Sequence, residues 1–291
     1  MTVAGATGAE LSVADFQRIR EYLRRETGVR FEDKKLTLFR SRLAKRLRVL
    51  GFNDYTAYAD FLIQQGPDGS ELGIALNLVT TNLTSFFREA HHFEYLTQTL
   101  IPEIVATPGR ERTIRIWSCA CSTGAEPYTL AIVLREALEG YSDWDVRILA
   151  SDINTEVLAY AERGIYSAEE VRGVPDALLR RHCQRGSGQR PGQYRIHPET
   201  RRLVNFRQVN LLRPWPDFHA PFDGIFCRNV LIYFSPEDQE KVVTEFAAKL
   251  RPGGALFLGH SENVTAGHVH FERLPKTVFR RRAHERSAAA R

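Results

Sequence analysis

The 291-residue sequence contains no long hydrophobic run and few cysteines, and both absences narrow the class of protein. No apolar stretch approaches the ~20 residues that a membrane-spanning helix needs. The first ten residues lack the basic patch and apolar core of a signal peptide. Four scattered cysteines are too few for a disulfide scaffold. We therefore expect a cytoplasmic, reduced, monomeric protein without a transmembrane segment.

The sequence also has little net charge outside its C-terminus. Of the formal charge of +5, residues 280–291 contribute +4, because five Arg stand there against one Glu. Two local basic patches remain. Residues 34–48 hold seven basic and no acidic side chains, and residues 180–202 hold seven Arg against Glu199. Local patches favour docking on an acidic partner at least as well as binding to nucleic acid.

Residues 1–85 show the periodicity of amphipathic helices, which predicts a small helical domain. The expected helices cover residues 13–25, 33–50, 54–64 and 70–82. On the second of them, an apolar stripe faces a basic one made of Lys34, Arg42, Lys45 and Arg48. The basic face is either a solvated helix surface or a docking surface.

After residue 88, apolar runs of strand length alternate with helical patterns, which predicts a doubly wound, mostly parallel α/β sheet. Strands are expected at 113–118, 146–151, 224–228, 255–259 and 277–281, and helices at 127–138, 155–163 and 236–250. Three short extended runs, 180–185, 193–196 and 204–209, interrupt this alternation. They predict a small antiparallel β-appendage inserted in the α/β domain.

Polar residues follow successive strands of the expected sheet, where ligands of such sheets bind. Glu126 opens the helix after the first strand, in a loop that lacks both GxGxxG and a P-loop lysine. An acid there suits an ammonium group or hydroxyls, or only the helix dipole. Asp152 ends the second strand, at the usual position for ribose hydroxyls, and otherwise caps the next helix. With Asn210–Leu211 and Arg228–Asn229 at later strand ends, these residues predict a nucleoside site.

Four motifs, in this order and spacing, resemble the CheR family of chemotaxis receptor methyltransferases: TNLTSFFREAHHF, WSCACSTGAEPYTLAI, SDIN and RNVLIYF. The resemblance runs from about Leu11 to Arg281. It implies a class I S-adenosylmethionine-dependent methyltransferase with a Rossmann-like sheet, a helical N-terminal domain and an inserted β-subdomain. The expected boundaries are 1–85, then 86–285 with the insertion at about 176–209, then a disordered basic tail, 286–291.

The resemblance also implies the roles of individual residues. The family's contacts to S-adenosylmethionine, or to its product S-adenosylhomocysteine, match Asn82, Thr84, Arg88, Glu126, Asp152, Asn210, Leu211, Arg228 and Asn229. Asp152 is expected to bind the ribose and Asn210–Leu211 the adenine, whereas Glu126 meets either the methionyl ammonium or the ribose. Arg88 and Tyr233 match a catalytic Arg and Tyr near the transferred methyl group.

The implied substrate is a glutamate side chain of a chemoreceptor, a methyl-accepting chemotaxis protein, and the implied product a glutamyl methyl ester that serves sensory adaptation. A glutamate with a pKa near ~4.3 is already a carboxylate at neutral pH and needs no general base. The rate of the reaction then depends mainly on how well the reacting groups are positioned. Arg88 can pair with the carboxylate and Tyr233 can orient it.

The same resemblance implies binding partners for two surfaces of the protein. The basic helix face could dock on receptor methylation helices. Arg185, Gly186, Gly188 and Gly192 retain the Gly-rich hairpin of family members that bind a receptor C-terminal pentapeptide as an edge strand. Charge for a carboxylate would come from Arg185, Arg190 and Arg195, unless these only keep an exposed edge soluble.

No metal site is expected from the cysteines and histidines. Cys119-Ala-Cys121 lacks a second ligand pair, and His91, His92, His268 and His270 are interpreted as non-ligands. Two rival functions are a nucleic-acid methyltransferase and a non-enzymatic receptor-tethering module. The balanced charge outside the C-terminus and the lack of an aromatic stacking motif oppose the first rival, and retention of both Arg88 and Tyr233 opposes the second.

Overall fold

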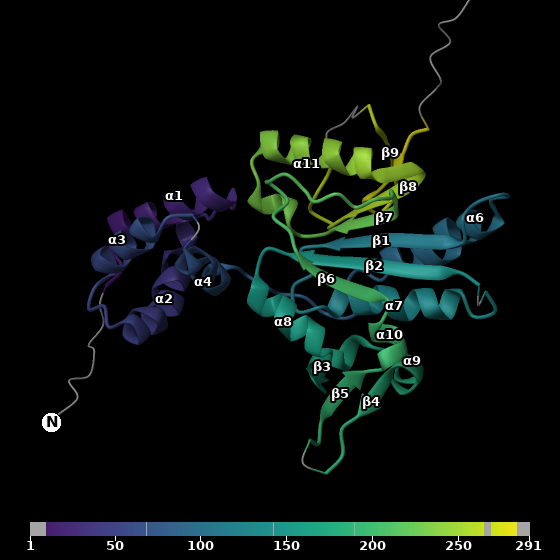
Figure 1. Cartoon of the computed structure of the whole chain (residues 1–291), viewed down its shortest axis with the longest axis horizontal. Helices are drawn as coiled ribbons and strands as arrows, with labels where there is room; N and C mark the ends of the chain where they lie inside the picture. Colours follow the sequence, from purple (N-terminus) through teal and green to yellow (C-terminus); the bar gives the residue numbers. More distant parts are fainter. Residues whose placement is uncertain (1–9, 68, 142, 189, 265–268, 284–291) are drawn as a thin grey trace, which may run out of the picture. The chain divides into compact units, whose positions relative to one another are not determined.

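The computed structural model describes residues 10–67, 69–141, 143–188, 190–264 and 269–283 (Figure 1). The chain divides into two compact units, residues 1–81 with 233–235, and residues 82–232 with 236–291. The predicted tail, 286–291, and His268 lie outside the described residues. Within the described part of the chain, no helix has the length and apolar character needed to cross a membrane.

The N-terminal unit is built from four helices. These are α1 (Val13–Thr27), α2 (Leu36–Leu50), α3 (Tyr55–Gln65) and α4 (Ser70–Val79), with a 3-10 turn, η1 (Asp33–Lys35), before α2. The Ser12 hydroxyl caps α1 by accepting from the Asp15 N–H at 3.0 Å, and Gly28 ends the helix in the left-handed conformation. The apolar stripes meet in the interior, where Phe16 and Phe39 pack edge to face with 5.0 Å between centroids.

The second unit contains a seven-stranded sheet in the order β6-β2-β1-β7-β8-β10-β9. Its strands are β1 (Thr113–Cys119), β2 (Asp145–Asp152), β6 (Val204–Gln208), β7 (Phe222–Cys227), β8 (Leu250–Leu258), β9 (Phe271–Leu274) and β10 (Val278–Arg281). The first five in spatial order pair in parallel, whereas β10 is antiparallel to both neighbours. This confirms the predicted α/β class. The order reverses beside β1, so a ligand crevice is expected at the carboxyl ends of β1, β2 and β7.

Helices cover both faces of this sheet. They are α5 (His91–Tyr95), α6 (Ile101–Ala106), α7 (Ala125–Ala137), α8 (Thr155–Arg163) and α11 (Pro236–Lys249), with a π-helical turn, η2 (Leu96–Leu100), between α5 and α6. Ile116 of β1 shares a buried core with Leu130 of α7. The next residue, Trp117, packs on Phe246 of α11 with 5.5 Å between the ring centroids. Because successive strand residues point to opposite faces, α7 and α11 lie on opposite sides of the sheet.

The predicted β-appendage exists, but two of its three strands were assigned wrongly or incompletely. The second sheet has the antiparallel order β3-β5-β4, with β3 (Ile165–Ser167), β4 (Cys183–Arg185) and β5 (Gln193–Ile196). Residues 204–209, predicted to belong to it, instead form β6, which pairs in parallel with β2. The missing strand, β3, lies before the predicted insertion. The run predicted at 180–185 begins as helix α9 (Asp176–His182), and short helices η3 (Glu170–Gly173) and α10 (Pro198–Arg201) complete this region.

Candidate functional site

The loop that follows β1 has the strained backbone of a ligand cradle. Ala120 and Ser122 adopt positive φ angles of 52° and 51°, and Gly124 adopts 90°. A Cβ at Gly124 would lie 2.7 Å from atoms of both Ala161 and Tyr166, so only glycine fits there. A positive φ angle raises the conformational energy of a non-glycine residue, and such residues concentrate at functional sites. The loop is therefore shaped by its tertiary contacts.

Asp152, at the end of β2, holds this loop in place. Its Oδ2 accepts the Ser122 N–H at 2.8 Å, and its Oδ1 accepts the Asn154 N–H at 2.9 Å. Capping of α8, the alternative role considered for Asp152, belongs to Asn154, whose side chain accepts from the N–H groups of Glu156 and Val157. Burial raises the pKa of Asp152, and the backbone hydrogen bonds oppose that shift. A carboxylate has about four lone-pair sites, so the backbone hydrogen bonds from Ser122, Ile153 and Asn154 still leave an acceptor site for a ligand hydroxyl.

Glu126, at the start of α7, shares a buried ion network with Arg228. Ser118 Oγ donates to Glu126 Oε1 at 2.6 Å, and Arg228 Nη1 donates to Oε2 at 3.0 Å. The Arg228 side chain is 3% exposed, lies 3.4 Å from Glu89 Oε2, and donates to the Arg88 carbonyl. Burial raises the pKa of Glu126, while Arg228 and Ser118 lower it. The carboxylate thus has a counter-charge yet stays 13% exposed, which leaves room for a ligand cation.

Glu262 organises the loop after β7, and the sequence analysis did not identify it. Its Oε2 accepts the N–H groups of Asn229 at 2.8 Å and Gly259 at 2.7 Å. Asn229 sits at a φ of 60°, so the buried Glu262 carboxylate holds a left-handed residue that the sequence placed in the site. The signal was available: an acid four residues after the end of β8, which places it at the same edge of the sheet as Asp152.

The structure also joins the upstream motif to the cradle. Ser122 Oγ donates to the Asn82 carbonyl at 2.9 Å, and Arg88 Nη1 donates to the Leu83 carbonyl at 3.1 Å. The Thr84 side chain, between them, is half-buried. Residues 82–88 therefore belong to the site region rather than to an independent linker.

The Asn210–Leu211 segment reaches the same place through β6. The Val209 N–H donates to the Asp152 carbonyl at 3.1 Å, so the segment begins beside Asp152. The Asn210 side chain accepts the Leu212 N–H at 2.9 Å, and the Leu211 carbonyl accepts from the Trp215 indole at 3.1 Å. A tight turn thus follows β6, and the apolar Leu211 side chain within it is buried.

Other predicted site residues lie in the N-terminal unit. Tyr233 ends the 3-10 helix η4 (Leu231–Tyr233), and its carbonyl accepts the Arg30 N–H at 3.1 Å. Lys34, Arg42, Lys45 and Arg48 are all exposed. Arg42, however, donates to the Leu78 and Thr80 carbonyls at 2.9 and 2.6 Å, so part of its charge satisfies the end of α4.

The surroundings of the cysteines and histidines bear on the prediction that they bind no metal. All four cysteines are buried and free, and burial raises the pKa of Cys119 and Cys227. Possible ligand atoms of Glu89, His91 and His92 lie within 4.8 Å of one another. His92 Nε2 is already 2.8 Å from the Lys276 carbonyl, and the Arg228 cation stands by Glu89, which opposes binding of another cation.

Comparison with known proteins assigns this architecture to one family. Residues 14–80 match the description "CheR methyltransferase, all-alpha domain", and residues 82–280 match "CheR methyltransferase, SAM binding domain". The chain is 44% identical to chemotaxis protein methyltransferase 2 of Pseudomonas aeruginosa, over 91% of this chain and 90% of that protein. It is 40% identical to the chemotaxis protein methyltransferase of Salmonella typhimurium, over 92% and 90%.

A third relative, the chemotaxis protein methyltransferase of Escherichia coli, is 40% identical over 92% of this chain and 91% of its own length. The helical unit, the parallel sheet with its crevice, and the antiparallel subdomain thus occur in a chain that matches these relatives almost end to end. The cofactor of the matched domain is S-adenosylmethionine (SAM). The chain belongs to the CheR methyltransferase family.

Proposed function

We propose that the protein transfers the methyl group of SAM to glutamate carboxylates of chemoreceptors, giving glutamyl methyl esters for sensory adaptation. The observation that carries this proposal is the pair of desolvated carboxylates, Glu126 at the start of the helix that follows β1 and Asp152 at the end of the adjacent strand β2. Their acceptor atoms suit an amino group and vicinal hydroxyls, both of which SAM carries. The printed names of the relatives supply the chemotaxis context.

The chain's own residues bind and orient the cofactor. Asp152 would accept from the ribose hydroxyls, and Glu126 from the amino group or the ribose. Asn82, Thr84, Arg88, Asn210, Leu211, Arg228 and Asn229 complete the proposed binding set. When bound, SAM supplies a methyl group on a positively charged sulfonium.

The substrate carboxylate needs positioning rather than activation. It is ionised at neutral pH, so no general base is required. Arg88 would pair with it, and Tyr233 would orient it through a hydrogen bond. Correct placement of reacting atoms is itself worth roughly 7–11 kcal/mol. A sparse site is therefore sufficient for this reaction.

The test is transfer of labelled methyl groups from SAM to receptor membranes, with base-labile release as methanol to identify a glutamyl ester. We expect Tyr233→Phe to lower turnover with saturating receptor by at least about tenfold, with cofactor affinity nearly unchanged, because the hydroxyl orients substrate. Tyr160→Phe is the matched control, since that hydroxyl donates to the Glu170 carboxylate on the surface. An unchanged rate in Tyr233→Phe would contradict its role, and labelling without methanol release would contradict the ester.

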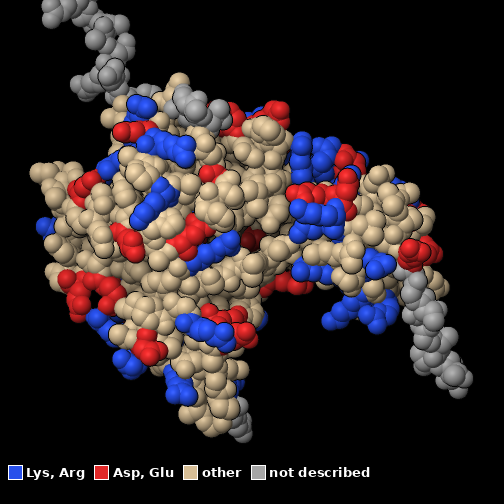
Figure 2. Space-filling model, turned by 180° about the vertical axis from the view of Figure 1, so that it is seen from behind, with Lys and Arg blue, Asp and Glu red and all other residues tan. Residues whose placement is uncertain are grey.

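The distribution of charge favours a protein substrate over a nucleic-acid substrate. Acidic and basic side chains are interspersed over the face of the molecule shown in Figure 2. A nucleic-acid enzyme typically presents a basic stripe instead.

The four buried cysteines carry free thiols, which is typical of proteins in a reducing compartment. We therefore propose that the protein is cytoplasmic.

We also propose that two surfaces hold the receptor. The exposed basic face of α2, with Lys45 and Arg48, and Lys34 in the preceding turn η1 would contact acidic methylation helices. The outer edge of β4 would add a receptor C-terminal pentapeptide as a strand. The backbone groups of residues 184 and 186 form hydrogen bonds with β5. The backbone N–H and C=O of Arg185 between them therefore point to the outer edge. Arg185 and Arg195 face opposite sides of this sheet, because Arg185 is paired with Tyr194.

Replacing Arg185 separates backbone pairing from side-chain charge. We expect Arg185→Pro to abolish binding of the pentapeptide, because proline removes the outward N–H. Arg185→Ala should retain most of the affinity. Calorimetric titration with the peptide measures both. Equal, full-strength binding by Arg185→Pro and wild type would rule out strand addition at this edge.

A further inference from the structure

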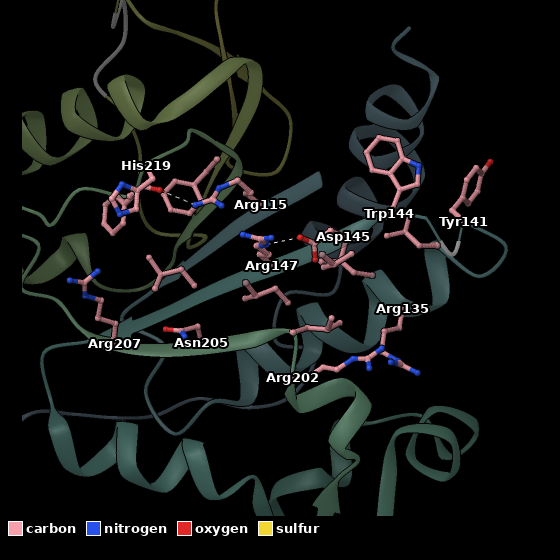
Figure 3. Close-up of a pocket in the computed structure, with 18 of the residues that line it drawn as sticks. Arg115, Arg135, Tyr141, Trp144, Asp145, Arg147, Arg202, Asn205, Arg207 and His219 are labelled. Carbon is pink, nitrogen blue, oxygen red and sulfur yellow. Dashed lines mark hydrogen bonds and ion pairs between the residues drawn. The ribbon is translucent and has the colours of Figure 1, made fainter. Parts of the chain in front are cut away.

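A groove of about 990 Å³ lies on the second unit, away from the cofactor crevice (Figure 3). It runs over one face of β2 and β6 and round their N-terminal ends to α7. Five arginines line it, against two carboxylates and one histidine: Arg115, Arg135, Arg147, Arg202 and Arg207, with Asp145, Asp217 and His219. No residue assigned above to the cofactor, the receptor or catalysis belongs to it.

The groove exists because one sheet face lacks a covering helix. The segment between β6 and β7 forms no helix, so this face of β2 and β6 is open beyond the Trp117–Phe246 contact. Parallel strands are normally buried on both faces and apolar throughout. Here β2 alternates instead, with Arg147 exposed and the next residue, Ile148, buried. The polar face is therefore encoded in the strand itself.

The described residues neutralise only part of the arginine charge in the groove, where Arg202 pairs with Glu199 at 2.8 Å. Arg115 and Arg147 stand side by side in register on β1 and β2. Like charges in such a cross-strand pair repel and destabilise the sheet. Burial, then Arg147 and Arg251, lower the pKa of Arg115. Arg147 pairs with Asp145 at 2.6 Å, but among the described residues no carboxylate pairs with Arg115 or Arg207.

We propose that this groove binds an extended acidic peptide segment of a partner protein. Residues of one strand face repeat every ~6.6–6.8 Å, and so do alternate side chains of an extended peptide. Arg207 on β6 is level with Ser151 of β2, which is four residues, or two such repeats, beyond Arg147. A peptide lying along the strands would therefore bring every second carboxylate to these arginines, while Leu149 and Trp144 contact its apolar atoms. Asp145 and Asp217 would repel the uniform charge of a polynucleotide, so a peptide of mixed composition fits better. The proposal does not depend on the methyl transfer proposed above.

The probe is a fluorescein-labelled (Glu-Ser)5 peptide, titrated by anisotropy at low salt into the full chain. We expect Arg147→Glu and Arg207→Glu each to weaken its binding at least tenfold. Both positions are exposed, so folding should be preserved. Arg273→Glu on β9 makes the same charge change on an exposed residue outside the groove and should have little effect. A (Gln-Ser)5 peptide controls for charge, and cofactor affinity should be equal in all variants.

Three results would overturn the proposal. One is no binding of (Glu-Ser)5 by the wild type up to 1 mM, on the order of the weakest useful affinities. Another is an equal loss in Arg273→Glu, or a loss confined to Lys45→Glu, which would place the peptide on α2. The last is tighter binding of single-stranded (dT)10 that the groove variants abolish, which would make the partner a nucleic acid.

Discussion

Replacing Arg228 with leucine should lower the free energy of unfolding by about 3–5 kcal/mol, because removing one partner of a buried ion network leaves the others uncompensated. The two carboxylates left behind, Glu126 and Glu89, are only 13% and 12% exposed. The guanidinium also stacks over Phe93 at 5.6 Å, and that contact is lost as well. Chemical denaturation measures the change, and we expect a melting temperature lower by roughly 10 °C.

The pH dependence of the stability loss in Arg228→Leu identifies the physical cause of that loss. Arg228 lowers the pKa of Glu126 and of Glu89 in the folded protein. Without it both folded-state pKa values rise, so as the pH falls the folded variant takes up protons over a pH range above that of the wild type. The stability deficit should shrink over that window. Arg273→Leu is a surface control. A deficit below about 1 kcal/mol, or one that is independent of pH, would refute the buried network as the cause.

Asp152→Ala should weaken binding of S-adenosylhomocysteine by roughly 10- to 150-fold, since a hydrogen bond to a charged group is worth about 1.5–3 kcal/mol. Two effects contribute. The ribose hydroxyls lose their acceptor, and the Ser122 N–H loses the carboxylate that holds the cradle in its positive-φ conformation. Isothermal calorimetry with the purified chain measures the affinity directly.

Asp145→Ala is the matched control for this experiment, because Asp145 begins the same strand that Asp152 ends. It removes an exposed carboxylate at the far end of β2 and should leave cofactor affinity within about twofold, as surface substitutions usually do. Unchanged affinity in Asp152→Ala would remove Asp152 from the binding set. An equal loss in both variants would indicate a general effect on β2 instead.

Local patterns in the sequence were sufficient to predict much of this architecture. Period-3.6 stripes predicted α1 at its observed start, and residues 155–163 were predicted as the helix that α8 forms. Strand–helix alternation predicted the parallel sheet, and Asp152 was predicted to end its second strand. These features depend on neighbours within a few residues, which is why periodicity reveals them.

Strand pairing was decided by the tertiary structure. Residues 204–209 are a short extended run that could join either sheet, and they join β2 because the parallel register lets Phe206 pack on Tyr128 of α7, at 5.8 Å. The three-residue strand β3 carries too short a pattern to detect, and it is held by pairing with β5 across an insertion. Partners distant in sequence leave no local periodicity, so such pairings cannot be derived from the pattern alone.

The sequence by itself determined which polar residues stand at the strand ends, because strand boundaries place them there. Only the tertiary structure decided what they do for one another. Arg228 is 102 residues from Glu126 along the chain, and Glu262 is 33 residues from Asn229. These groups meet because β1, β7 and β8 are adjacent in the sheet. The open arginine groove has the same origin, since a missing crossover helix exposes side chains that the sequence shows only as an alternating strand.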